Sequence, residues 1–229
     1  MYKVLNIGEK LYKQHPYIAY SPDLIEGDWD TIVSYRYRRK LTPATLNKYR
    51  CINLHTSCLP FNRGAYPIFF AHWNNTPLGV TVHLMEPAYD TGNILCQTIF
   101  ENYLSCSLHE AWVLMNRKVE DLFFDNIDVV LDPNNKGLPQ HNAGDFHTKK
   151  EFEEIQPYLI EGWNTLCSDI PKIKTLYYID KIEKVRAKNN INWMDVLRVA
   201  VRADHTSTIN LIRKIAECDN EINNLLRKI

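Results

Sequence analysis

Short apolar runs alternate with polar, turn-rich segments over the first half of the chain, as in sheets whose strands are separated by helices and loops. Runs rich in β-branched residues predict strands at residues 2–8, 17–22, 30–37 and 51–55. Between them, residues 9–16 predict a short helix, and Pro43 predicts a second helix, because proline is favoured at the first helical position. Strand, helix and strand with short connections indicate a mostly parallel, Rossmann-like α/β sheet flanked by helices.

The pattern continues to about residue 131. Residues 66–75 predict a helix that begins near Pro67, and residues 88–101 predict a turn followed by a strand. Residues 78–86 alternate Val80, Val82 and Leu84 with Thr81, His83 and Met85, which is typical of a strand with two distinct faces. Residues 107–131 predict a long amphipathic helix, whose first turn carries a capping box of Ser107 and Glu110.

The character of the chain changes near residue 132, where a polar, turn-rich stretch predicts a linker. We therefore expect a catalytic domain over residues 1–132 and a smaller extension of extended segments and helices over residues 133–229, with substrate and dimer contacts. Residues 173–180 are expected to be extended, and the segment 192–201 is part of the tail. Isoleucine and leucine at three-to-four spacing predict a final amphipathic helix, packed in the core or against a partner.

The composition of the chain argues against several classes of function. The 229 residues are 45% hydrophobic, and their formal net charge is zero. A neutral chain offers no basic field to attract nucleic acid or an anionic membrane, so we expect neither as a partner. Six cysteines lack any C-x-x-C pair, and no signal-peptide pattern begins the chain, which favours reduced thiols and a cytoplasmic location. No apolar run approaches the roughly 18 residues of a membrane span.

Candidate chemistry gathers at one predicted edge of the sheet. Asn53 and His55 are two positions apart at the end of a strand, so their side chains point the same way. Asp90 follows in the turn Asp90-Thr91-Gly92, and ligands of open α/β sheets bind outside the carboxyl ends of the strands. An amide, an imidazole and a carboxylate suit proton transfer and oxyanion stabilisation without a covalent intermediate. Taken singly, each residue also fits an ordinary turn or core role.

The segments around Asn53, His55 and Asp90 resemble a known protein family. The stretch "INLHTSCLPFNRGAYP", followed by "LGVTVHLMEPAYDTGNILCQ", resembles the 10-formyltetrahydrofolate-dependent formyltransferase family over roughly residues 28–130. The segments "DTIVSYRYRRKL" and "FHTKKEFEEI" resemble the branch that formylates nucleotide-linked amino sugars. The tail resembles helical tails on enzymes of bacterial nonulosonic (pseudaminic-type) acid pathways. The part before residue 30 is shorter than in the family, which implies that one helix of the usual Rossmann half is reduced.

The resemblance implies a reaction and roles. A formyl group passes from 10-formyltetrahydrofolate to the primary amine of a nucleotide-linked amino sugar, in bacterial surface-glycan biosynthesis. His55 would take a proton from the amine, Asn53 would donate to the oxyanion, and Asp90 would orient His55 and relay protons. No metal is implied, and no cluster with metal-ligand spacing is present in the sequence. Sister enzymes often pair through their C-terminal halves, so we expect a homodimer.

Binding residues follow from position. The cofactor-binding candidates are Ser34, Tyr35, Arg36, Tyr37, His83, Leu84, Met85, Ala88 and Tyr89. The substrate-binding candidates are Arg63, Gly64, His147, Lys149 and Lys150. Arg36, Arg38 and Arg39 suit a glutamate tail or a phosphate, and a solvated loop is the alternative. Two other functions remain open: a methionyl-tRNA formyltransferase, and a non-catalytic module that binds folate or a nucleotide sugar.

Overall fold

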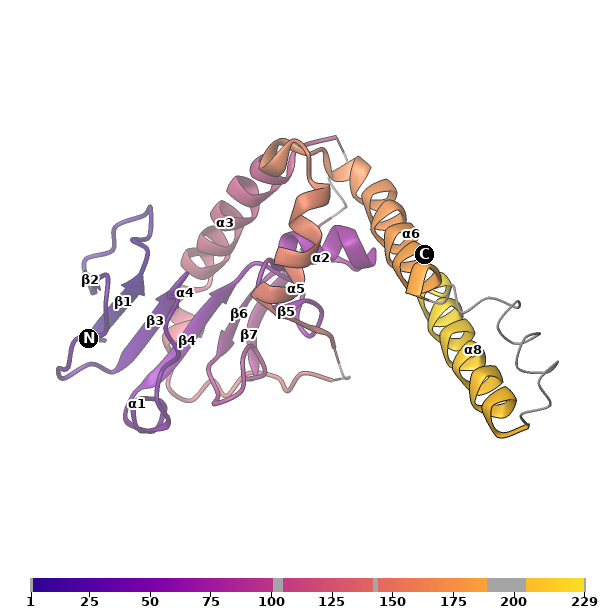
Figure 1. Cartoon of the computed structure of the whole chain (residues 1–229). Coiled ribbons are helices and arrows are strands. Elements are labelled where there is room, and N and C mark those ends of the chain that lie inside the picture. The colour runs from indigo at the N-terminus through magenta and orange to yellow at the C-terminus, as the bar shows by residue number, and fades with distance from the viewer. Residues whose placement is uncertain (1, 101–104, 142–143, 189–204, 229) are drawn as a thin grey trace. The chain divides into compact units, whose positions relative to one another are not determined.

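The computed structural model describes residues 2–100, 105–141, 144–188 and 205–228. Its contacts divide the chain into two compact units, Met1–Ser168 and Asp169–Ile229. The first unit holds the sheet and its covering helices, and the described part of the second holds two long helices (Figure 1). The division between the units lies beyond the expected domain boundary after residue 132.

The sheet of the first unit has six strands in the order β2-β1-β3-β4-β6-β7. Their bounds are β1 Val4–Gly8, β2 Ile18–Ser21, β3 Thr31–Tyr35, β4 Arg50–His55, β6 Leu78–Leu84 and β7 Ile94–Phe100. β1 pairs in parallel with β2 and β3, and β3 pairs in parallel with β4. β4 and β6 are antiparallel, as are β6 and β7. The predicted mostly parallel α/β sheet is therefore confirmed.

Helices and loops cover both faces of this sheet. On one face, α3 (Leu108–Asp125) packs against β4, β6 and β7, and α2 (Pro67–Asn74) packs against α3 and β6 (Figure 1). The buried stripe of α3 has the spacing of one helix face: Leu108, Ala111, Met115, Val119 and Phe123. On the other face, Leu5, Ile7, Ile32, Leu41, Tyr49 and Cys51 form a cluster beside α1 (Pro43–Lys48). This second face also carries the candidate site.

The predicted capping box is present: the side chain of Ser107 accepts from the N–H of Glu110, and the carboxylate of Glu110 accepts from the N–H of Ser107. The helix is shorter than predicted, because it ends at Asn126 and a separate helix, α4 (Ile127–Leu131), follows. A second, two-stranded sheet pairs β5 (Arg63–Gly64) with β8 (Phe146–His147), ahead of α5 (Lys149–Ile155).

The helix predicted over residues 9–16 is wrong. Those residues form bends and a turn between β1 and β2, and two of their backbone N–H groups have side-chain acceptors in place of helix carbonyls. Leu11 donates to Oδ1 of Asn6 on β1, and Tyr12 donates to Glu120 on α3 at 2.6 Å. A short segment that anchors its N–H groups in this way does not need a helical ladder. No helix is assigned between β2 and β3 either, which agrees with the expected reduction of one helix in this half of the sheet.

The extended segment expected at residues 173–180 is also wrong, because α6 (Ile170–Lys188) runs through it. The buried side chains of Ile170, Tyr177 and Val185 recur at helical spacing, and this burial overrides the strand propensity of the tyrosine pair. The final helix is confirmed as α8 (His205–Leu226), which packs against α6 within the second unit. The segment 192–201 lies outside the described residues.

The register of the sheet sets the place of the site. In the centre of the sheet, Asn53 of β4 pairs with Ser34 of β3 on one side and with His83 of β6 on the other. Neighbouring residues in register point to the same face. Three polar side chains therefore lie across three strands, at the edge where β3 and β4 end.

Candidate active site

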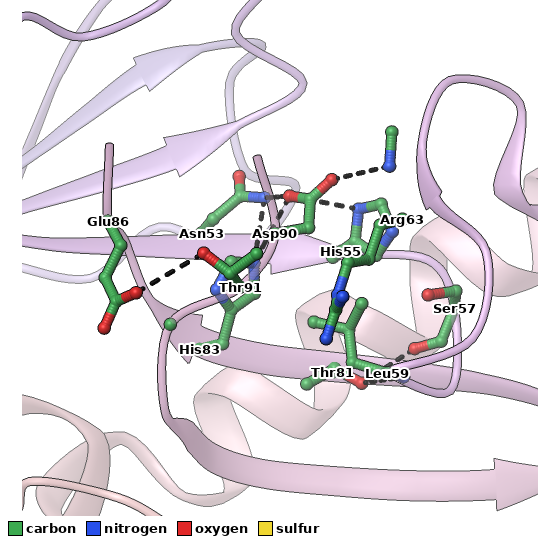
Figure 2. A network of polar contacts seen from close by, with 12 residues as sticks. Asn53, His55, Ser57, Leu59, Arg63, Thr81, His83, Glu86, Asp90 and Thr91 are labelled. Atoms are coloured by element: carbon green, nitrogen blue, oxygen red, sulfur yellow. Dashed lines mark hydrogen bonds and ion pairs between the residues drawn. The ribbon is translucent and has the colours of Figure 1, made fainter. Parts of the chain in front are cut away.

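The carboxylate of Asp90 lies at the centre of a polar cluster (Figure 2). Its Oδ1 accepts a hydrogen bond from Nδ2 of Asn53 at 3.2 Å, and it lies 3.8 Å from Nδ1 of His55 and 3.5 Å from Nε2 of His83. Its Oδ2 accepts from the backbone N–H of Gly64 at 2.8 Å. The expected convergence of Asn53, His55 and Asp90 is therefore present, and His83 and Gly64 join it.

The loop that carries Asp90 is fixed in one conformation. Asp90 has a φ of 54°, in the left-handed region that few residues other than glycine adopt. Nε2 of Gln140 donates to the carbonyl oxygens of Asp90 and Gly92, both at 2.8 Å. Only glycine fits at position 92, because a Cβ there would fall 1.9 Å from the carbonyl oxygen of Leu84. This backbone geometry holds the carboxylate against the strands.

Burial and charge act against each other within the cluster. Burial alone would raise the pKa of Asp90, but His55, His83 and the N–H of Gly64 outweigh it and hold that pKa well below its ordinary value. Burial lowers the pKa of His55, although the charge of Asp90 acts in the opposite direction. The cluster therefore combines an ionised carboxylate with a neutral imidazole, and a neutral imidazole is ready to accept a proton.

The neighbours of His55 fix which nitrogen is basic. Its Nε2 lies 3.3 Å from the carbonyl oxygen of Asn62, which can only accept, so Nε2 carries the proton. Nδ1 of the neutral ring is then the free base, and it faces the Asp90 carboxylate. A proton taken by Nδ1 would be stabilised by the adjacent negative charge.

A cavity of about 1050 Å³ opens onto this cluster. Asn53, His55, His83 and Asp90 all line it. Seven of the expected cofactor-binding residues line it as well, namely Ser34, Arg36, Tyr37, His83, Met85, Ala88 and Tyr89. Its volume is at the upper end of the range for single-ligand pockets, so it has room for two bound molecules side by side.

The other predicted binding residues fall into two groups, those that line the cavity and those that do not. Gly64, His147 and Lys149 line the cavity. Tyr35, Leu84, Arg63 and Lys150 are not among its lining residues. Tyr35 lines a separate cavity of about 530 Å³, and the guanidinium of Arg63 donates to Oε1 of Gln140. These four remain predictions without support from the geometry.

His147 also has a packing role. Its ring stacks on Phe70 with 3.7 Å between centroids, and its nitrogens contact Asp145 and Glu151. The side chain is nearly buried, so its main effect is to fix β8 beside β5.

Sequence reasoning missed an aromatic wall of the cavity formed by Tyr66, His109, Trp112 and Trp163. The ring of Trp163 lies 6.1 Å from that of Tyr66 and 6.0 Å from that of Phe152, and Trp163 is 38% exposed. An aromatic residue on the polar side of the helix 107–131 is the one sequence signal that would have pointed to Trp112. Trp163 gave no such signal, because it lies in a short turn of residues 162–164.

Other chemistries find little support. Among the described residues, no group of three or more His, Cys, Asp and Glu side chains could hold a metal ion. Burial raises the pKa of the Cys58 thiol, which disfavours the nucleophilic thiolate. The hydroxyl of Ser57 donates to the carbonyl oxygen of Phe61. Neither side chain is arranged as an activated nucleophile.

The sheet and the cluster at its edge define a Rossmann-like α/β domain with an acid–base site. Residues 20–108, somewhat less than half of the chain, match a family model described as formyl transferase. Asn53, His55 and Asp90 all lie within the matched residues.

Comparisons with individual proteins agree. The chain is 24% identical over 160 residues to a dTDP-4-amino-4,6-dideoxyglucose formyltransferase from Mycobacterium tuberculosis, which is 66% of this chain and 65% of that protein. The chain thus spans somewhat less than two thirds of the length of this curated relative. A methionyl-tRNA formyltransferase from Geobacillus thermodenitrificans is 33% identical over 129 residues, covering 54% of this chain and 37% of that one.

A solved structure is similar over more of the chain. It is the formyltransferase PseJ from Anoxybacillus kamchatkensis, in complex with UDP-4,6-dideoxy-4-formamido-L-AltNAc and tetrahydrofolate. The TM-score is 0.65 at 26% identity, and the match covers 73% of this chain and 96% of PseJ. A sugar N-formyltransferase from Shewanella is similar with a TM-score of 0.55 at 25% identity, covering 62% of this chain and 58% of that one.

The electrostatics of His55 give a first prediction. In the wild-type chain, an NMR titration should place the pKa of His55 below 6.5, because burial disfavours the imidazolium. Asp90→Asn should lower this pKa further, since the charge that favours the imidazolium is lost. Glu86→Gln is the matched control: it removes an exposed negative charge from the same cavity and should leave the pKa of His55 nearly unchanged. A wild-type pKa above 6.5, or a rise in Asp90→Asn, would contradict this account.

Proposed function

We propose that this chain transfers a formyl group from 10-formyltetrahydrofolate to the primary amine of a nucleotide-linked amino sugar. The observation that carries the proposal is the cluster of Asn53, His55 and Asp90 at a cavity large enough for both molecules. The match to the formyl transferase model supports the donor chemistry, and the similarity to PseJ supports a nucleotide-linked amino sugar of the pseudaminic type as acceptor.

The geometry suggests a mechanism. The amine nitrogen of the sugar attacks the formyl carbon, and Nδ1 of His55 takes the proton that the amine releases. The tetrahedral intermediate carries an oxyanion, with which the amide of Asn53 can share the hydrogen that it gives to Asp90 in this structure. The bond between the formyl carbon and the folate nitrogen then breaks, and the imidazolium of His55 returns its proton to that nitrogen. Asp90 stabilises the imidazolium in between.

The folate would lie beside the loop that leads to Asp90. Tyr37, Leu41, Leu46 and Met85 give that part of the cavity apolar surface for a flat ring. Arg36 forms an ion pair with Glu9 and lies over the ring of Trp112, and Arg39 is paired with Asp23. The cavity wall there also carries Arg38 and Lys40, whose charges suit the glutamate tail of the folate.

The nucleotide sugar would lie against the aromatic wall. Trp163 offers a partly exposed ring supported from behind by Tyr66 and Phe152, which suits stacking with a pyrimidine base. Lys149 lines the cavity nearby, and its ammonium suits a diphosphate. His147 helps by fixing the strand that precedes Lys149.

The cellular setting is proposed on chemical grounds. The six cysteines are free thiols, which agrees with work in the reducing cytoplasm, where folate cosubstrates and nucleotide sugars are available. Among the described residues, no helix is both long and apolar enough to span a membrane. A role in bacterial surface-glycan biosynthesis follows from the acceptor class. A neutral net charge argues against initiator tRNA as the acceptor, although methionyl-tRNA formyltransferases match part of the chain.

A substitution series tests the reaction. Asn53→Ala, His55→Ala and Asp90→Ala should each lower turnover by about a hundredfold or more, as expected for the loss of an acid–base or oxyanion group. The assay mixes the chain with 10-formyltetrahydrofolate and a panel of amino-sugar nucleotides, with initiator methionyl-tRNA as a separate arm, and follows the mass gain of one formyl group. Asn93→Ala, an amide outside the cluster that donates to Lys136, is the control and should keep full activity. Formylation of the tRNA alone would replace the sugar proposal, and no transfer to either acceptor would refute it.

The aromatic wall gives a separate prediction. Trp163→Ala should raise the KM for the nucleotide sugar by roughly tenfold, with little change in kcat, because base stacking is worth about 1–3 kcal/mol. Trp163→Phe keeps a ring and should recover most of the affinity. The KM for 10-formyltetrahydrofolate should not change in either variant. An unchanged KM for the nucleotide sugar in Trp163→Ala would show that the base binds elsewhere.

The expected homodimer remains a prediction. Its structural grounds are exposed apolar side chains on two helices of the second unit, α6 and α8. Leu176 and Ile179 on α6 are each 48% exposed, and Leu226 on α8 is 51% exposed. We propose that two chains bury this apolar surface together.

Analytical ultracentrifugation decides the oligomeric state. The wild-type chain should sediment as a dimer at micromolar concentration, and Leu176→Lys with Ile179→Lys should shift it to the monomer while leaving the fold of the first unit intact. Lys172→Glu, an exposed charge change on the same helix, should leave the dimer in place. A monomeric wild-type chain would rule the dimer out.

A further inference from the structure

His83 makes contacts that no role described so far explains. It is 1% exposed and lies on β6 directly opposite Asn53 of β4. The register of β6 with β7 shifts between Val82 and His83, as it does at a β-bulge. Bulges commonly re-aim a side chain next to a functional site. In Figure 2 the imidazole of His83 lies directly below Asn53 and Asp90.

The two ring nitrogens of His83 have different partners. Nδ1 lies 2.7 Å from the carbonyl oxygen of Leu84, which can only accept, so Nδ1 carries a proton. Nε2 lies 3.3 Å from Nδ2 of Asn53, an amide nitrogen that can only donate, so Nε2 is the acceptor. The neutral tautomer with its proton on Nδ1 satisfies both contacts, whereas a proton on Nε2 would serve the Asp90 carboxylate at 3.5 Å and leave the contact with Asn53 unmet.

The amide of Asn53 is thereby held on two sides. Its Nδ2 donates one hydrogen to Oδ1 of Asp90 at 3.2 Å and the other to Nε2 of His83 at 3.3 Å. Nε2 of His83 and Oδ1 of Asp90 are only 3.5 Å apart, and both are acceptors in this tautomer. The NH₂ group of Asn53 lies between them and relieves their repulsion. Two acceptors fix the plane of an amide, whereas a single acceptor leaves it free to turn.

We propose that His83 is a positioning residue, which accepts an N–H of Asn53 at Nε2 and so sets the orientation of the Asn53 amide and the Asp90 carboxylate for formyl transfer. This role rests on the proposed function. It is distinct from the folate contact expected of His83 from its place in the sequence. As charge develops on the oxyanion, the hydrogen that Asn53 gives to Asp90 can be shared with it, while the contact with His83 keeps the amide in place.

Two substitutions separate this role from simple packing. His83→Gln can place an acceptor where Nε2 lies, whereas His83→Asn places its polar atoms near Nδ1, close to the carbonyl of Leu84. If His83 positions Asn53, the Gln variant should keep kcat within about threefold of wild type. The Asn variant should lose roughly tenfold to a hundredfold, which is the usual effect of removing the support of an active-site group. KM values should change little in either. The matched control is His72→Gln, since His72 is a buried histidine on α2 outside the cluster, and its kcat should stay at the wild-type level.

An NMR measurement on the wild-type chain tests the geometry without any activity. Two-bond ¹⁵N–¹H correlations should show Nδ1 of His83 protonated and Nε2 bare, and the side-chain NH₂ signal of Asn53 should move in His83→Asn more than in His83→Gln. A protonated Nε2, or an Asn variant as active as the Gln variant, would overturn the proposal. If no formyl transfer is found with any acceptor, the proposed function fails, and the tautomer together with the Asn53 signal still decides whether His83 positions the amide.

Discussion

The site depends on one buried negative charge, the carboxylate of Asp90. Burying an ionised carboxylate is costly unless it is hydrogen-bonded and faces positive or polar groups. Here an amide and an imidazole from β4, a backbone N–H from β5 and an imidazole from β6 surround it. The charge stays ionised because this set outweighs burial. The Asp90 carboxylate is therefore held in place by the strands, by the β5–β8 pair and by the loop of residues 90–92.

This support joins parts of the chain that are distant in sequence. Gly64 reaches Asp90 because β5 pairs with β8, so residues 146–147 help to place a donor more than 80 positions earlier. Gln140 fixes the Asp90 loop through two backbone carbonyls. The polar stretch after residue 132, which reads as a linker in the sequence, thus contributes directly to the geometry of the site. Its polar residues form hydrogen bonds to the site's backbone.

The sequence predicted the sheet and the convergence of Asn53, His55 and Asp90, because strand alternation and turn chemistry are local signals. It did not predict the helix at residues 173–180, where tyrosines and isoleucines favour a strand and tertiary burial decides otherwise. The helix expected at residues 9–16 failed because Asn6 and Glu120 capture its N–H groups, which only the tertiary structure shows. The contact of His83 with Asn53 depends on the register of β4 and β6, which could not be predicted from the sequence. Trp163 lies in a short turn without hydrophobic periodicity, so no pattern indicated that it lines the cavity.

The central claim is that His55, next to Asp90, acts as the base that takes the proton from the sugar amine as the formyl group is transferred to that amine. The most direct test follows transfer of a ¹³C label from 10-[¹³C]formyltetrahydrofolate to an amino-sugar nucleotide by His55→Gly, with free imidazole added. The account predicts almost no transfer without imidazole, and a rate that rises with the concentration of neutral imidazole as the small base enters the space left by the side chain. Transfer at the wild-type rate in His55→Gly without imidazole would contradict it.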